Sequence, residues 1–291
     1  MSARNARVVW RARCARIASH LLPLLFVPFC TVAAQPSLPR SLAWRFTYAV
    51  SPTADGKPLP AGNTVLDVVI WAGTARITVR EGALKAIVGE SGVILLRSGD
   101  STLAIVNPAK REVLKVATGE FGGLISGPAG SMPLEVSDVT SATRSLGAGP
   151  RVLGYPTRRI SLSQGYTLRL TTPVGQRTIR TDQELLLTVS RDIARLDPGF
   201  RSFADQFARS LGLPGPVRRK LRDAERAVPP GFPVLTLTTA VTVSGLDTLR
   251  STTRAEMTAL RRDTVDTAGF AIPADYRVTE MSRLLQRPRR P

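Results

Sequence analysis

The sequence predicts a mainly β protein with some α-helix, built as a curved antiparallel sheet with one or two helices on its concave face. Three observations support this prediction. Short period-two segments recur along the chain, turn residues separate them closely, and one segment shows helical spacing of phenylalanines. Closely spaced strands of this kind favour an antiparallel meander over alternating β-α-β units.

The first β region is predicted over residues 41–117. Between Trp44 and Val50, large apolar residues alternate with other residues, as in a half-buried strand. Further strand candidates follow at 65–71, 75–80, 93–97, 103–106 and 112–116. They are separated by turn residues at 55–56, 81–82, 99–100 and 107–108, where glycine allows a positive φ and proline restricts φ.

Residues 118–133 are rich in glycine and small side chains and are predicted to form a loop. Their glycines do not match the spacing of a phosphate-binding or dinucleotide-binding loop. A second β region with helices is predicted over 134–281, with strands at 151–163, 166–171 and 177–190 and turns at 164–165 and 173–175. Strands at 234–243, 248–260 and 271–281 complete it.

One helix is predicted to begin after Asp197, which suits an N-cap, with Pro198 in its first turn. Phe200, Phe203 and Phe207 follow at helical spacing, and Gly212 is expected to end the helix. A shorter basic helix is predicted at 217–227, with a solvated charged face or, alternatively, a membrane-surface or anion-binding face. The Arg- and Pro-rich residues 282–291 are expected to be a disordered tail.

The first 34 residues are predicted to be a cleavable signal peptide. Five arginines and no acidic residue precede the apolar run 21–29, which is followed by Val32-Ala33-Ala34. The run is too short to span a membrane, and no later segment comes closer. Lipidation of Cys30 is a weaker alternative, because bulky Phe29 precedes it. We therefore expect an exported protein, periplasmic or extracellular, whose residues 35–281 form a single β-rich domain.

Signal cleavage would remove Cys14, Cys30 and His20, the chain's only cysteines and histidine. Without them, a Ser-His-Asp triad, a Cys-His dyad and the common zinc sites are excluded. Strand carboxylates stay formally eligible for all-carboxylate chemistry, namely Asp67, Glu112, Glu135 and Glu184. We expect a non-enzymatic protein with no catalytic residue, metal or cofactor.

The aromatic residues suggest a ligand cavity. A curved sheet with an apolar concave face either closes on its own helix or leaves a cavity for an acyl chain. The candidate cavity residues are Phe200, Phe203, Phe207, Trp44, Phe46 and Trp71.

The charge suggests a different partner. Five of the +18 formal charges lie in the signal peptide, which leaves +13 and an attraction to anionic envelope polymers. The basic residues are scattered, however, and most of the aromatics lie on apolar faces, so nucleic-acid binding is not expected.

Three landmarks follow one another in the second half: Leu153-Gly154-Tyr155, Gly231-Phe232-Pro233-Val234, and the segment from Phe270 to Tyr276. With them the chain resembles the exported bacterial family known as domain of unknown function four-four-one-two, on Gly154, Tyr155, Gly231, Pro233, Phe270, Pro273 and Tyr276. Asp275 departs from the family's usual glycine, and Thr188 lies near a position where tryptophan is common.

The resemblance implies a periplasmic or outer-membrane-associated protein, similar to the LolA-like half-barrels that carry lipoproteins, and it implies no catalytic residue. The leading hypothesis is therefore a non-enzymatic envelope protein that binds or carries a lipid, a lipoprotein's acyl chains or another amphiphile. The alternative is an envelope scaffold that binds an anionic polymer or an acidic partner through its basic surface.

Overall fold

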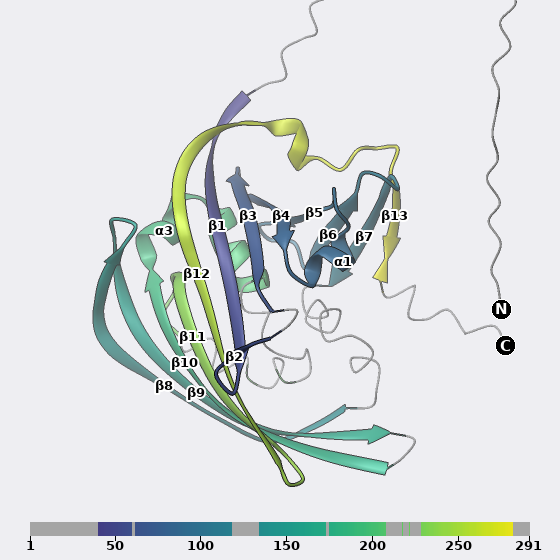
Figure 1. The fold of residues 1–291 in the computed structure, drawn as a ribbon. Coiled ribbons are helices and arrows are strands. Elements are labelled where there is room, and N and C mark those ends of the chain that lie inside the picture. The colour runs from purple at the N-terminus through teal and green to yellow at the C-terminus, as the bar shows by residue number, and fades with distance from the viewer. Residues whose placement is uncertain are drawn as a thin grey trace, which may run out of the picture. The chain divides into compact units, whose positions relative to one another are not determined.

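A computed structural model describes residues 40–59, 62–117, 134–172, 175–207, 217, 221 and 228–281. The chain divides into two compact units, Met1–Ser37 and Leu38–Pro291, and every described residue belongs to the second. The predicted signal peptide, the loop 118–133 and the tail 282–291 lie outside the described residues. The described residues are mainly β, as predicted, and place thirteen strands in one sheet (Figure 1).

The first β region follows the predicted pattern closely. Each predicted strand lies within one of the strands β1 (Arg40–Ala54), β3 (Thr64–Trp71), β4 (Thr74–Glu81), β5 (Val93–Arg97), β6 (Thr102–Asn107) and β7 (Glu112–Ala117). Two short elements were not predicted, namely β2 (Lys57–Pro58) and the helix α1 (Leu84–Val88). Strands β3 to β7 pair antiparallel in chain order, which confirms the meander.

The second β region consists of β8 (Leu134–Val152), β9 (Tyr155–Thr172), β10 (Gly175–Ser190), β11 (Phe232–Ser244) and β12 (Asp247–Asp266). Strand β8 was not predicted over most of its length, and the turn between β8 and β9 divides the predicted strand 151–163. Strands β9 to β12 are longer than predicted. The expected turn at 164–165 is wrong, because β9 continues through it. A Cβ on Gly165 would lie 2.7 Å from Thr140 Oγ1 and 2.8 Å from Asp182 Oδ1. This glycine therefore allows close side chains from both neighbouring strands and does not mark a chain reversal.

The strand order is β13-β7-β6-β5-β4-β3-β1-β12-β11-β10-β9-β8, so β1 and β12 join the two regions of an open sheet. The predicted strand 271–281 is shorter, because the 3₁₀ helix η4 (Thr267–Phe270) and a turn at Pro273 precede β13 (Arg277–Glu280). β13 pairs parallel with β7, which departs from the predicted antiparallel sheet. Both edges resist further pairing, because β13 has four residues and β8 has three register shifts.

Three short helical segments pack against the sheet: the first was not predicted, and the other two follow each other directly where the helix after Asp197 was predicted. They are α3 (Arg191–Leu196), α4 (Pro198–Ser202) and the π-helix η2 (Phe203–Phe207). Asp197 is extended between α3 and α4, because a residue before proline avoids the helical region. It caps α4 as predicted, and the expected helix end at Gly212 lies outside the described residues.

The main core lies between these helical segments and one face of the sheet. Its centre is a cluster of four phenylalanines from β1, α4, η2 and β11, each less than 2% exposed: Phe46, Phe200, Phe203 and Phe232. Neighbouring ring centroids lie 5.3–5.9 Å apart in stacked and edge-to-face arrangements. Because its residues come from β1, from β11 and from the helical segments, this cluster packs the helical segments against both β regions.

We expect the substitution Asp197→Ala to lower the free energy of unfolding by about 1–2 kcal/mol, the usual cost of losing an N-cap. The Asp197 carboxylate accepts hydrogen bonds from Gly199 N at 2.7 Å and from Gly73 N at 2.9 Å, so it links α4 to the β3–β4 turn. Urea denaturation followed by circular dichroism measures the change. Asp247→Ala, in the exposed β11–β12 turn, is the control and should change stability by less than about 0.5 kcal/mol. Equal effects of the two substitutions would contradict the role of Asp197.

Candidate ligand pocket

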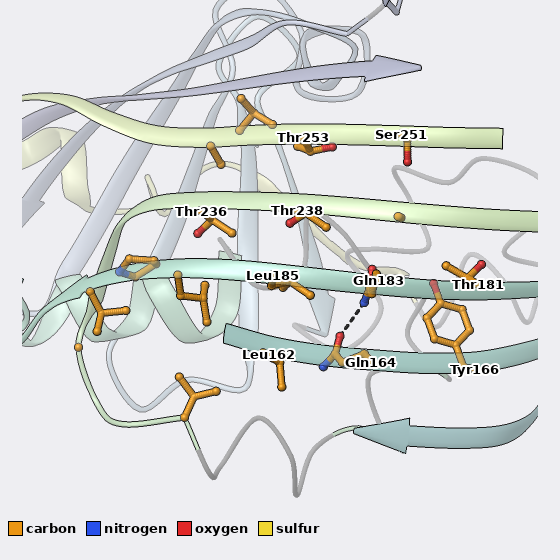
Figure 2. Close-up of a pocket in the computed structure, with 18 of the residues that line it drawn as sticks. Leu162, Gln164, Tyr166, Thr181, Gln183, Leu185, Thr236, Thr238, Ser251 and Thr253 are labelled. Atoms are coloured by element: carbon orange, nitrogen blue, oxygen red, sulfur yellow. Dashed lines mark hydrogen bonds between the residues drawn. The ribbon is translucent and has the colours of Figure 1, made fainter. Parts of the chain in front are cut away.

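A pocket of about 350 Å³ lies on the sheet face formed by β9 to β12 and β1 (Figure 2). Period-two alternation directs every second side chain of these strands towards it. Its described lining consists of uncharged residues: Tyr48, Val50, Leu162, Gln164, Tyr166, Thr181, Gln183, Leu185, Leu187, Val189, Val228, Pro229, Gly231, Pro233, Thr236, Thr238, Ala240, Thr242, Ser251, Thr253 and Ala255.

The charged residues of β10 beside the pocket lie on the opposite face of the sheet. On β10, the pocket residues Thr181 and Gln183 alternate with Arg180, Asp182 and Glu184, which are exposed. Arg180 Nε lies 3.0 Å from Asp182 Oδ2, so these charges neutralise each other on the far side of the sheet. The part of the sheet that lines the pocket therefore presents a neutral face, with these charges of β10 on its other side.

The neutral face grades from apolar to polar along the strands. Strand register places the lining in successive rows: Val50-Ala255-Thr236-Leu187, then Thr253-Thr238-Leu185-Leu162, then Ser251-Ala240-Gln183-Gln164, and finally Thr242-Thr181-Tyr166. Figure 2 shows this order from Thr236 to Tyr166. At a rise of roughly 3.4 Å per residue, the first and last rows lie roughly 20 Å apart. The pocket is thus amphipathic along its length.

Side-chain hydrogen bonds organise the polar rows. Gln183 Nε2 donates to Gln164 Oε1 at 2.6 Å, which Figure 2 marks with a dashed line. The hydroxyl oxygens of Thr181 and Thr242 lie 3.3 Å apart. Tyr166 is buried beneath Val217 and Leu221, so the polar end of the pocket is covered at this point.

Two buried tyrosines border the pocket. Burial raises the pKa of the Tyr48 hydroxyl well above its ordinary value, although a hydrogen bond with Thr236 opposes the shift. Burial likewise raises the pKa of Tyr166, opposed by a hydrogen bond with Thr181. Both phenols therefore stay protonated in the folded protein when an exposed tyrosine would ionise.

We expect the free energy of unfolding to fall as pH rises above about 10, where tyrosines of the unfolded chain ionise. The folded state keeps the Tyr48 proton, so each pH unit costs up to about 1.4 kcal/mol for this residue. Tyr48→Phe should flatten this alkaline decline, even though it loses the hydrogen bond with Thr236 at every pH. Urea midpoints measured from neutral pH to about pH 11 test this; parallel curves for the two proteins would contradict it.

None of the six predicted cavity residues is among the described lining. Phe46, Phe200 and Phe203 fill the core cluster instead. Trp44 packs edge-on against Phe200, with ring centroids 6.5 Å apart. Trp71 packs against Phe270 in a separate cluster, and the side chain of Phe207 lies outside the described part of the chain.

Sequence reasoning missed the residues that do form the pocket. The available signal was the alternation of Thr236, Thr238 and Thr242 on β11 without any charged residue on the same face. Threonine favours strands, so this pattern indicates a strand and only the neighbouring strands reveal a pocket.

The residues on which the family resemblance rests lie at three separate places in the fold. Leu153 and Gly154, with φ of 50° and 83°, form the two-residue turn that brings Tyr155 into β9. Gly231 and Pro233 lie at the start of β11 and line the pocket. Phe270, Pro273 and Tyr276 lie in the connection to β13, where Phe270 and Tyr276 pack against different apolar clusters.

The four strand carboxylates lie on four different strands, and each has its own surface partner. Asp67 pairs with Arg80, and Glu112 pairs with Arg277. Glu135 lies 3.8 Å from Arg169, and Glu184 accepts a hydrogen bond from Ser161 at 3.0 Å. Within the described ranges, no three His, Cys, Asp or Glu side chains are grouped as metal ligands, and no helix is long and apolar enough to cross a membrane.

An arginine cluster, formed by Arg45, Arg76 and Arg261, lies on the sheet face opposite the main core. Arg45 Nε lies 3.1 Å from Asp263 Oδ2, an ion pair without the alignment of a hydrogen bond. Asp263 also lies 3.8 Å from Arg261. Burial and, to a smaller extent, the neighbouring charge of Arg45 lower the pKa of Arg76. The three positive charges of the arginine cluster therefore exceed the one negative charge of Asp263 beside it.

No protein-family model matches the chain, and no curated protein matches it. Two solved structures of PNGF-II, in different crystal forms, are similar to 82% of this chain, each with a TM-score of 0.33 and 10% sequence identity. The chain covers only 31% and 32% of those two chains. A similarity this distant carries no argument about function.

Proposed function

We propose that this protein is a non-enzymatic binder or carrier of an amphiphilic, lipid-like ligand, which it holds in the pocket of β9 to β12. The observation that carries the proposal is the uncharged lining, which grades from leucine, valine and proline to threonine and glutamine. A graded surface of this kind complements a molecule that has an apolar chain and a polar head.

The size of the pocket supports the same function. A volume of about 350 Å³ falls within the range of roughly 300–1,000 Å³ that is usual for small-molecule sites. The apolar rows would remove an alkyl chain from water, which is favourable by about 0.8 kcal/mol for each buried methylene group.

The cellular setting belongs to the proposal. The signal-peptide pattern favours an exported protein in the periplasm or outside the cell, and the landmark residues favour the four-four-one-two family and its LolA-like half-barrel. In that arrangement, the sheet would curl around the helical segments and the pocket would receive a lipid or a lipoprotein's acyl chains at the envelope.

Lipid extraction and mass spectrometry of the natively purified protein test the proposal, together with titration by Nile red, an uncharged dye that fluoresces in apolar sites. We expect a co-purifying amphiphile, saturable dye binding and displacement of the dye by that amphiphile. Absence of both a co-purifying lipid and saturable dye binding would overturn the proposal.

The arginine cluster favours a second candidate function, that of a scaffold which binds an anionic envelope polymer. Arg45 and Arg76 share a region that contains more positive than negative charge. Retention on heparin that disappears in moderate salt would support this candidate, because salt screens exposed charges. Unchanged retention on heparin after combined Arg45→Gln and Arg76→Gln substitution would exclude the arginine cluster as the binding surface.

A further inference from the structure

We infer that the pocket selects an amphiphile with an uncharged head that both donates and accepts hydrogen bonds, such as an amide or a hydroxyl, bound against Gln164 and Gln183. This inference rests on the proposed function and specifies its ligand class. The observations that support it are the chemistry of the polar rows and the burial of Gln164 and Tyr166 within them.

The two glutamines keep both donor and acceptor capacity beyond their mutual hydrogen bond, because each side-chain amide has two N–H donors and an oxygen with two lone pairs. Their mutual hydrogen bond uses Gln183 Nε2 and Gln164 Oε1. Gln164 Nε2 and Gln183 Oε1 have no side-chain partner among the described residues. Neither atom is fully buried, so a ligand can reach both. Figure 2 shows both atoms directed away from the shared bond. A carboxylate would use only the donor, an ammonium only the acceptor, and an amide or hydroxyl both.

Burial disfavours an ionised head at the same place. Gln164 is 4% exposed and Tyr166 is 7% exposed, so a head in contact with them loses most of its hydration. The described lining offers no opposite charge to compensate, because the charged residues of β10 project from the other face. Moving an unpaired charge out of water costs far more than moving a hydrogen-bonded neutral group.

The graded lining also orients the ligand. Leu187 and Ala255 lie in the apolar row at the core end, and Gln183 lies two rows further towards the polar end. The two rows are separated by four residues of β10, or roughly 14 Å. The alkyl chain would therefore extend from the glutamine pair towards Tyr48 and Val189, which line the core end of the pocket.

Displacement of Nile red by three amphiphiles with the same chain tests this inference: dodecanamide, dodecanoate and dodecylammonium at neutral pH, each below its micelle-forming concentration. We expect dodecanamide to displace the dye at a concentration at least about tenfold lower than either ion, corresponding to about 1.4 kcal/mol. Equal or tighter binding of dodecanoate would overturn the inference while the proposed function stands. Saturable binding of neither the dye nor any amphiphile would instead refute the proposed function.

Two variants test whether Gln183 determines the preference among the three amphiphiles. Gln183→Leu should remove most of the preference for dodecanamide while dye binding continues. Gln183→Glu should change the preferred ligand to dodecylammonium, a gain of binding that a misfolded protein would not show. The control Glu184→Gln alters the adjacent residue on the opposite face and should leave the order of the three ligands unchanged. Unchanged selectivity in both Gln183 variants would overturn the inference.

Discussion

Phe200→Ala is expected to lower the free energy of unfolding by about 3–5 kcal/mol, a large fraction of a typical domain's stability. Phe200 is fully buried in α4, the middle one of the three helical segments that cover the core. Its ring stacks on Phe46 at 5.6 Å and meets Phe232 edge-on at 5.4 Å. Alanine would leave a cavity between β1 and β11 that these rigid rings could not fill.

Urea denaturation at equilibrium measures this effect, with circular dichroism and tryptophan fluorescence as independent probes. Leu42→Ala is the control, because Leu42 is 63% exposed on β1 and should contribute less than about 0.5 kcal/mol. A loss below about 1 kcal/mol for Phe200→Ala would contradict its place at the centre of the core.

Leu187→Arg is expected to weaken dye and amphiphile binding by about a hundredfold, equivalent to about 2.7 kcal/mol. Leu187 lies in the apolar row of the pocket, where an alkyl chain would displace the hydration of the new guanidinium. The Leu187 side chain is only partly buried, so the substitution should leave the fold intact.

Leu186→Arg is the matched control for this substitution. Leu186 is the adjacent residue of β10, is also partly buried, and does not line the pocket. Nile red titration of both variants, with circular dichroism to verify folding, should show loss of binding only for Leu187→Arg. Equal loss in both variants would show that the ligand does not occupy the neutral face.

The first β region was predictable because its signals are local. The alternation of Trp44, Phe46 and Tyr48 follows the two-residue period of a strand, and turn residues separate the short strands that follow. The N-cap at Asp197 was predictable for the same reason, since its partner Gly199 is two residues away. The loop 118–133 and the signal peptide remain predictions.

The second region was harder because its features depend on distant partners. Gly165 resembles a turn residue in sequence, but the side chains of Thr140 and Asp182 require the glycine there. The helix after Asp197 was predicted, but α3 before it was not, and the predicted helix changes from α4 to the π-helix η2 at Phe203. An apolar stripe indicates which face of an element is buried, and it does not specify whether the opposing surface is filled or hollow.

Local patterns in the amino-acid sequence predicted that this protein is mainly β, where most strands of its first region lie, and which phenylalanines belong to an apolar face. The long-range contacts of the fold place β1 beside β12 and put Phe46, Phe200 and Phe203 into the core. They also place the pocket among threonines, leucines and glutamines of five strands. This difference arises because strand periodicity is encoded within a few residues, whereas a pocket forms where strand register brings together side chains that are far apart in the chain.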